Sequence, residues 1–519
     1  MRTSTRLLLN SVANLTGGVV NTVLALVLTP ILVHSLGRSG YGAWELAGHI
    51  TVYTPFIFLG LGGAVGRFVA VYMTQKDYES MNAFVNTALV YFRCGAVAAL
   101  GIGMVVAFRL THWTNIDPSL HEATFWCVVI VVASLMIRLY FGPVDAILWS
   151  LERFDLVALT QVVFRVIRLV AVVLTLPLLN PEPAVGLLIV AVIMTATDVI
   201  PVVIRVFLAR HYCPHLEINM RLARWKHLWA GLRFAIATIL WKTATVLLTY
   251  VPFLVIGHYL SDADVGDYGI CGRILAFVVM LVDQVVITTA PVAAKMAARN
   301  GVADLQQLLV RSSKYTMGMA LPMSLLLGIL APVVLYLWVG PKFLHIANVL
   351  LVLSISRCLW CLQNSSFYVL TGTNKHAGLG LIGLICIGAV TVSGSIAIGS
   401  YGMGLMGIAT ATTLILAIGC GVVMPVYTCR QVGLKLSTYI RHVYIRPLLA
   451  VIPFVAVCLV LRRVSLEHAW SVLAAVMLAG VVLLPLTYWF HLFDEWDRNL
   501  FRDRFRALLA RLPIGRANR

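Results

Sequence analysis

The sequence is short of charged residues and of long polar stretches. Asp, Glu, Lys and Arg make up 12% of its 519 residues, whereas soluble domains carry about a quarter. No segment between its apolar runs is longer than about 30 residues, which leaves no room for a soluble domain. Hydrophobic residues, in contrast, make up 60% of the chain. These proportions exclude an ordinary soluble protein and predict a multi-pass membrane protein.

Acidic residues are scarcer than basic ones, with 21 Asp and Glu against 39 Lys and Arg and a net charge of +18. Few basic residues fall on one side of the predicted membrane spans, namely Arg38, Arg109, Lys342, Arg462 and Arg463. Because Lys and Arg resist translocation, this asymmetry predicts that both termini are cytoplasmic. We expect the charge to set the topology and to contact membrane lipids, and we expect no nucleic-acid partner.

Residue patterns typical of enzymes and metal sites are missing. The ten cysteines are scattered and suggest no disulfide framework. Cys358 and Cys361 have redox-motif spacing but fall within a predicted span, where we expect them to pack in the core. His211, Cys213 and His215 have no fourth ligand nearby. With short outer loops and no nucleophile–base pair, the sequence predicts no enzyme activity, no metal and no cofactor.

Long apolar runs predict about fourteen transmembrane helices, since a bilayer core of ~30 Å needs roughly 20 apolar residues per helix. The first run is longer than the core of a signal peptide, so we expect it to be retained. The predicted spans are 10–34, 44–74, 82–109, 123–150, 156–179, 184–210, 230–257, 267–294, 313–338, 346–371, 376–399, 402–428, 443–461 and 468–491.

Two similar segments indicate an internal repeat. HSLGRSGYGAW, residues 34–44, and HYLSDADVGDYGI, residues 258–270, each lie between the first and second spans of one half of the chain. An even number of spans separates them, which predicts a parallel repeat unless the similarity is chance. The predicted fold is all-α, with two pseudo-symmetric six-helix lobes and two C-terminal helices. Its parts are a lobe at 1–210, a basic cytoplasmic linker at 211–229, a lobe at 230–428, two further helices at 429–491 and a basic amphipathic cytoplasmic tail at 492–519.

Several charged residues fall within the apolar spans. A charge at the centre of a membrane helix costs at least ~2.5–3.5 kcal/mol, so such residues face a wet cavity or a partner. Acids are fewer than bases here, which favours a cationic cavity, with ion pairing as the alternative. The basic residues are Arg67, Arg93, Arg138, Arg165, Arg168, Lys242, Arg273 and Arg357, and the acids are Asp145, Asp198 and Asp283.

Arg165 and Arg168 form the most specific pair among them. They stand at i and i+3 in the run VVFRVIRLVAVVLTL, hence on one helix face, and roughly 14 and 18 Å into the membrane. Two guanidinium groups on one face suit a phosphate or pyrophosphate. The three acids could neutralise arginines or carry a coupling ion. Asn14 and Asn21, at i and i+7, could line the cavity or bridge helices.

Several motifs resemble bacterial polysaccharide flippases. They include Thr29-Pro30, Leu36-Gly37, Tyr41-Gly42-Ala43-Trp44 and the run from Gly60 to Arg67, followed by VGDYGICGRI (265–274), LTGTNKHAGLG (370–380) and SYGMGLMGIATA (400–411). The flippases belong to the multidrug/oligosaccharidyl-lipid/polysaccharide exporter superfamily, which also contains the lipid II flippase. The resemblance covers nearly the whole chain and implies two six-helix lobes with two additional helices.

The resemblance also implies a function. The expected activity is translocation of a polyprenyl-pyrophosphate-linked oligosaccharide from the inner to the outer leaflet of the bacterial inner membrane. The product would serve O-antigen, capsule or exopolysaccharide assembly. Expected partners are this substrate, membrane lipids and the polysaccharide polymerase machinery, and we expect a monomer. The alternative is a multidrug cation antiporter of the same superfamily, against which the cationic interior and the absence of an acid in the first span both argue.

Overall fold

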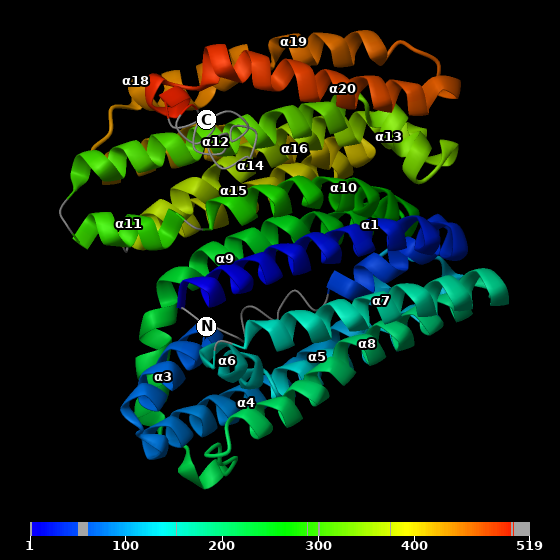
Figure 1. The fold of residues 1–519 in the computed structure, drawn as a ribbon. Coiled ribbons are helices and arrows are strands. Elements are labelled where there is room, and N and C mark those ends of the chain that lie inside the picture. Colours follow the sequence, from blue (N-terminus) through cyan, green and yellow to red (C-terminus); the bar gives the residue numbers. More distant parts are fainter. Residues whose placement is uncertain are drawn as a thin grey trace, which may run out of the picture.

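The computed structural model describes residues 3–49, 61–151, 153–287, 289–298, 301–373, 375–499 and 502. Every regular element in these ranges is a helix (Figure 1). Within these ranges, twelve helices are long and apolar enough to cross a membrane, or thirteen if Val302–Ile329 and Ala331–Trp338, which are bent by 75°, count as one span. The predicted span 44–74 runs through residues 50–60, outside the described residues. The all-helical membrane class is thus confirmed, and the count of fourteen stays a prediction.

The helices form two groups (Figure 1). The N-terminal group consists of α1 (Thr3–His49), α3 (Leu61–Gln75), α4 (Tyr78–Trp113), α5 (His121–Tyr140), α6 (Pro143–Ser150), α7 (Phe154–Leu179) and α8 (Pro183–Tyr212). The C-terminal group consists of α9 (Trp225–Tyr259), α10 (Asp262–Val286), α11 (Thr289–Ala298), α12 (Val302–Ile329), α13 (Ala331–Trp338), α14 (Ala347–Gly372), α15 (Ala377–Gly399), α16 (Gly404–Ile418), α17 (Met424–Val432), α18 (Leu436–Tyr439), α19 (Arg446–Leu461) and α20 (Ala469–Thr487).

Helix α1 corrects one sequence prediction. Residues 35–43 were expected to form a loop between two spans, but the helix continues to His49 and is interrupted at Gly37, which has φ 71° and ψ 177°. Only glycine adopts such a backbone without strain, so the loop reduces to one residue. The loop predicted between the spans 230–257 and 267–294 is also shortened. A capping box between Ser261 and Asp264 starts α10 at Asp262, because it satisfies backbone N–H groups of the first turn.

Two other predicted spans are interrupted. The span 123–150 divides into α5 and α6 at Phe141-Gly142, where Pro143 occupies the first turn of α6. Proline has no N–H to donate and is tolerated there, but inside a helix it breaks the hydrogen-bond pattern. The span 267–294 likewise divides into α10, which ends at Val286, and α11, which begins at Thr289.

The two groups meet most closely where α1 and α10 pack together. A Cβ atom placed on Gly42 would lie 1.7 Å from the carbonyl oxygen of Asp262, and one on Gly266 would lie 2.8 Å from that of Arg38. The two segments of the predicted repeat therefore lie against each other, backbone to backbone. Figure 1 shows the groups converging at this end, which we call the closed end, and diverging toward the other, the open end.

Polar contacts between the groups hold the closed end together. Arg38 on α1 forms an ion pair with the buried Asp267 on α10, with its Nε 3.1 Å from Oδ1. His345 contacts the same carboxylate at 2.6 Å. Nearby, the backbone N–H of Asn115 donates to the carbonyl oxygen of Gly257 at 2.8 Å. At this end the helices are thus joined by charge and hydrogen bonds as well as by glycine packing.

The last two long helices, α19 and α20, pack on α12 and α13 through a separate apolar cluster that includes Val333, Phe454 and Val476. Residues after α20 return to α12, where Lys314 contacts both Asp494 and Asp497. The amphipathic helix predicted in the tail, around Phe501 to Leu509, lies outside the described residues apart from Arg502.

Candidate functional site

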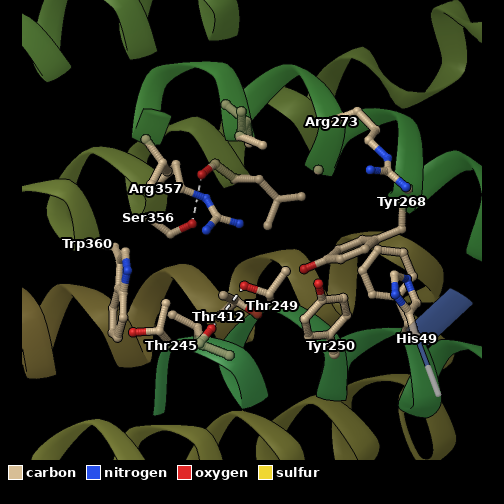
Figure 2. A pocket seen from close by; sticks show the side chains of 18 of the residues that line it. His49, Thr245, Thr249, Tyr250, Tyr268, Arg273, Ser356, Arg357, Trp360 and Thr412 are labelled. Carbon is tan, nitrogen blue, oxygen red and sulfur yellow. Dashed lines mark hydrogen bonds between the residues drawn. The ribbon is translucent and has the colours of Figure 1, made fainter. Parts of the chain in front are cut away.

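A cavity of about 590 Å³ lies between the two groups. Helix α1 contributes the turn from Trp44 to His49, and α9, α10, α14 and α16 contribute the remaining walls (Figure 2). The glycine contact between α1 and α10 lies on the side of the closed end. Where that contact stops, the two helices leave space between their polar faces.

Hydroxyl groups line much of this cavity. They belong to Thr245, Thr249, Tyr250, Tyr268, Ser356 and Thr412. Figure 2 shows the Tyr250 and Tyr268 hydroxyls pointing into the middle of the cavity, with Arg357 on one side and Arg273 on the other. Hydroxyls both donate and accept hydrogen bonds, so such a wall can pair with a polyhydroxylated molecule without demanding a charge.

Arg273 on α10 is bound to Glu45 on α1. Its Nη2 and Nε lie 3.0 and 3.2 Å from Oε1 of the carboxylate. The Tyr41 hydroxyl donates to the same oxygen at 2.6 Å, and His49 Nε2 lies 3.3 Å from Oε2. The Glu45 side chain is only 3% exposed, whereas that of Arg273 is 45% exposed. The arginine therefore faces the cavity while it neutralises a buried acid.

Arg357 on α14 has no acidic partner among the described residues. His345, just before α14, bonds Asp267 near the start of α10, so both helices start at the closed end. At ~1.5 Å per residue, Arg273 lies roughly 17 Å and Arg357 roughly 15 Å along their helices. Each residue is thus about half the thickness of a ~30 Å membrane core away from the start of its helix. Asp283, farther along α10, lines the cavity and accepts a hydrogen bond from Asn364 at 2.6 Å.

Arg138, Arg165 and Arg168 gather elsewhere, within the N-terminal group. Arg168 on α7 pairs with Asp198 on α8 and donates to Thr197 at 2.8 Å. Arg138 on α5 lies 3.8 Å from the same Asp198. Arg165 is half-buried and has no hydrogen bond or ion pair to a described residue. One acid thus neutralises part of a cluster of three arginines.

The remaining predicted residues are dispersed. Asp145 pairs with Arg205 at 2.6 Å, and Arg93 lies over the Tyr140 ring at 4.4 Å. Lys242 is exposed on α9, one turn before the cavity residue Thr245. Asn21 is half-buried, with a buried Oδ1 that has no hydrogen-bond partner in the described part. The side chains of Arg67 and Asn14 lie outside the described residues. The predicted residues whose side chains are described therefore do not share one lining.

Sequence reasoning missed Glu45 and its neighbours. Tyr41, Glu45 and His49 are spaced at i, i+4 and i+8, which places three polar side chains on one face of an apolar helix. That spacing was a usable signal, but it fell at the predicted boundary between a loop and a span. Arg205 was missed for a similar reason, because it lies near the end of the predicted span 184–210 and was counted among the cytoplasmic basic residues.

The long apolar helices, which form two groups with a polar, charged cavity between them, define a multi-pass membrane protein, and the comparisons agree with this class. The profile of the family described as "Polysaccharide biosynthesis protein" matches residues 7–297. EpsK of Bacillus subtilis (strain 168), an uncharacterised membrane protein, is 21% identical over 506 residues, which cover 96% of this chain and 98% of EpsK.

Two solved structures show the same fold. The lipid II flippase MurJ in an inward closed conformation matches with a TM-score of 0.65 at 14% identity, covering 93% of this chain and 99% of MurJ. An inward-facing multidrug resistance MATE transporter matches with a TM-score of 0.66 at 15% identity, covering 82% and 98%. The chain belongs to the polysaccharide biosynthesis protein family and is a multi-pass membrane protein, as its motifs predicted.

Proposed function

We propose that the protein is a flippase that carries a polyprenyl-pyrophosphate-linked oligosaccharide from the inner to the outer leaflet of the bacterial inner membrane. Its product would enter O-antigen, capsule or exopolysaccharide assembly. The observation that carries this proposal is the position of Arg357, which faces a cavity lined by hydroxyls and has no acid beside it among the described residues. An unpaired guanidinium in a partly dehydrated site is well suited to an anion.

The substrate has three parts with different requirements. The pyrophosphate would bind Arg357 and the exposed edge of Arg273, since guanidinium groups hold phosphate oxygens in pairs. The sugars would bond the hydroxyls of α9 and α16, which replace water around a polar glycan. The polyprenyl tail needs no polar partner and would remain in the bilayer. Arg165, in the cluster around Asp198, is the candidate for a second anion contact in the N-terminal group.

We further propose that transport proceeds by alternating access of two pseudo-symmetric six-helix lobes, followed by two additional helices. In this arrangement the chain has fourteen spans, both termini are cytoplasmic and the open end faces the cytoplasm. The inward conformations named for both similar structures support this orientation. Asp283 lines the cavity and contacts Asn364, a neutral partner, so it is a better candidate than Asp145 or Asp198 to bind a coupling proton or sodium ion.

A multidrug cation antiporter is the second candidate. Two acids, Glu45 and Asp283, line the cavity, and the MATE transporter shares the fold. Glu45, however, is already neutralised by Arg273. Asp283 is then the main attraction for a cation, and Arg357 in the same cavity repels it.

The test uses a strain that lacks this gene. Loss of surface polysaccharide together with build-up of lipid-linked oligosaccharide in the inner leaflet, both restored by the gene, is the expected result. Arg357→Gln should fail to restore transport, Arg357→Lys should restore part of it, and Arg462→Gln, in a loop far from the cavity, should behave as wild type. Normal polysaccharide with increased sensitivity to cationic dyes would instead identify the antiporter.

A further inference from the structure

Arg273 makes two kinds of contact, because it lines the cavity and also joins the two groups of helices. Its Nε and Nη2 donate to Glu45 on the opposite group. A guanidinium has five N–H donors, so the rest of its hydrogen-bonding capacity remains for a molecule in the cavity. The 45% exposure of the side chain gives such a molecule access. An anion that reaches this arginine therefore competes with Glu45 for it.

We propose that Glu45 is a specificity-determining residue, and that an anionic headgroup loosens the closed end by replacing Glu45 on Arg273. This inference rests on the proposed function, which supplies the pyrophosphate. A pyrophosphate carries more charge than one carboxylate and can engage both edges of the guanidinium. A neutral or cationic molecule cannot make this exchange. Glu45 would thus tie opening of the closed end to the presence of an anionic cargo.

The surroundings of Glu45 make the exchange feasible. A buried carboxylate that lost every partner would be strongly disfavoured. After Arg273 leaves, Glu45 keeps the hydroxyl of Tyr41 at 2.6 Å and the ring of His49 at 3.3 Å. Both lie on α1 itself, so they move with Glu45 when the two groups separate. The carboxylate is thus supported within its own group and does not depend on the bridge.

The location of the pair links it to the closed end. A Cβ on Gly269 would lie 3.0 Å from Cγ of Glu45, so the ion pair directly continues the glycine contact between α1 and α10. The Arg38–Asp267 pair lies farther toward the closed end on the same two helices. Anion binding at Arg273 would therefore release the inner part of this interface, next to the cavity, before its outer part.

Cysteine cross-linking across the closed end tests the proposal. Asn115 and His258 come from opposite groups and are in contact, with the Asn115 amide donating to the His258 carbonyl at 3.1 Å. The yield of a disulfide or short thiol cross-link in Asn115→Cys/His258→Cys protein in nanodiscs reports the closed fraction. Each single-cysteine variant serves as the blank for native cysteines, of which Cys94 is exposed. The probe is farnesyl pyrophosphate, with farnesol as the uncharged control.

Farnesyl pyrophosphate should lower the yield and farnesol should not. Glu45→Gln should lower the closed-to-open ratio about tenfold without any probe, the change expected when an interaction worth ~1.4 kcal/mol is lost. Arg273→Gln should lower the closed-to-open ratio by the same factor. The double variant should lower it no further, because each single substitution already removes the same ion pair. Glu467→Gln, an exposed acid in a distant loop, should have no effect.

Two outcomes would overturn the inference. Equal yields in Glu45→Gln and wild type would mean that the pair does not hold the closed end. A lowered yield in Glu45→Gln with no response of wild type to farnesyl pyrophosphate would mean that an anion does not displace it. Either result leaves the flippase proposal to the gene-deletion assay, so the two ideas can fail separately.

Discussion

Lys314 Nζ lies 2.6 Å from Oδ2 of Asp497, and neither side chain reaches solvent, with exposed fractions of 0% and 1%. The same lysine contacts Asp494 at 3.0 Å, and the hydroxyl of Tyr315 donates to Asp497. A buried lysine is tolerated only when it is paired. The segment that follows α20 is therefore fixed to α12 by an ion pair, because separating the two would leave buried charges without a partner.

Lys314→Met should destabilise the protein by about 3–5 kcal/mol, because removing one partner leaves a buried carboxylate uncompensated. The measurement is thermal unfolding of the purified protein in detergent. Lys342→Met, an exposed lysine near α14, is the matched control and should unfold at the wild-type temperature. Equal unfolding temperatures for the two variants would contradict a structural role for Lys314.

Acid should release the same segment. Burial alone raises the pKa of Asp494, but the hydrogen bond and charge of Lys314 and the charge of Arg446 outweigh it and hold this pKa below its usual range. A carboxyl with a lowered folded pKa contributes stability above its unfolded pKa, and this stability is lost as pH falls through the folded value.

Docking of residues 493–498 should accordingly weaken below pH about 4. Hydrogen–deuterium exchange of this segment at pH 3 and pH 6, corrected for intrinsic rates, would detect the change. In Asp494→Asn the difference in exchange between pH 3 and pH 6 should be smaller than in wild type. Loosening that is already complete at pH 6 would refute the assignment to this carboxyl.

Gly42→Ala should prevent the closed end from forming. Its Cβ would lie 1.7 Å from the Asp262 carbonyl oxygen, a contact that backbone atoms cannot relieve by a rotamer change. Gly101→Ala, on α4 and outside the cavity lining, is the control because its Cβ meets no neighbouring atom within 4 Å. The cross-link between positions 115 and 258 should be lost in the first variant and kept in the second, and transport should follow it.

Replacing Arg165 and replacing Arg168 should have different effects on stability and transport. Arg168→Gln removes the main partner of Asp198 and should lower the unfolding temperature. Arg165→Gln breaks no ion pair to a described residue and should leave stability near wild type while transport falls. Both are measured in the complemented deletion strain and on purified protein. Replacing both by Ala should abolish transport but not membrane insertion, and wild-type transport in that double variant would exclude an anion site there.

Much of the fold follows from apolar run lengths, because a membrane helix must be both long and apolar. What run length cannot reveal is where a helix bends. Gly37 interrupts α1 without ending it, and the capping box at Ser261 starts α10 inside a predicted loop. Such boundaries depend on single backbone torsions and caps, which average hydropathy does not detect.

Prediction of the site from the sequence has a similar limit, which the charged residues show. The sequence placed Arg273 and Arg357 within apolar spans, and both line one cavity, but it grouped them with Arg168, which α8 neutralises through Asp198. Helix periodicity gives the face of a residue within its own helix. It does not give the neighbouring helix, so pairing across helices could not be read from one sequence.

The contact at Gly42 and Gly266 also gives α10 a mechanical advantage. From Gly266 to Val286 the helix extends for ~30 Å, whereas Arg273 is only ~10 Å from the contact. If the contact is a fulcrum, a rotation that moves Arg273 by about 2 Å, enough to break a hydrogen bond, moves the far end by about 6 Å. A short displacement at one ion pair is thereby amplified about threefold where a bulky cargo must pass.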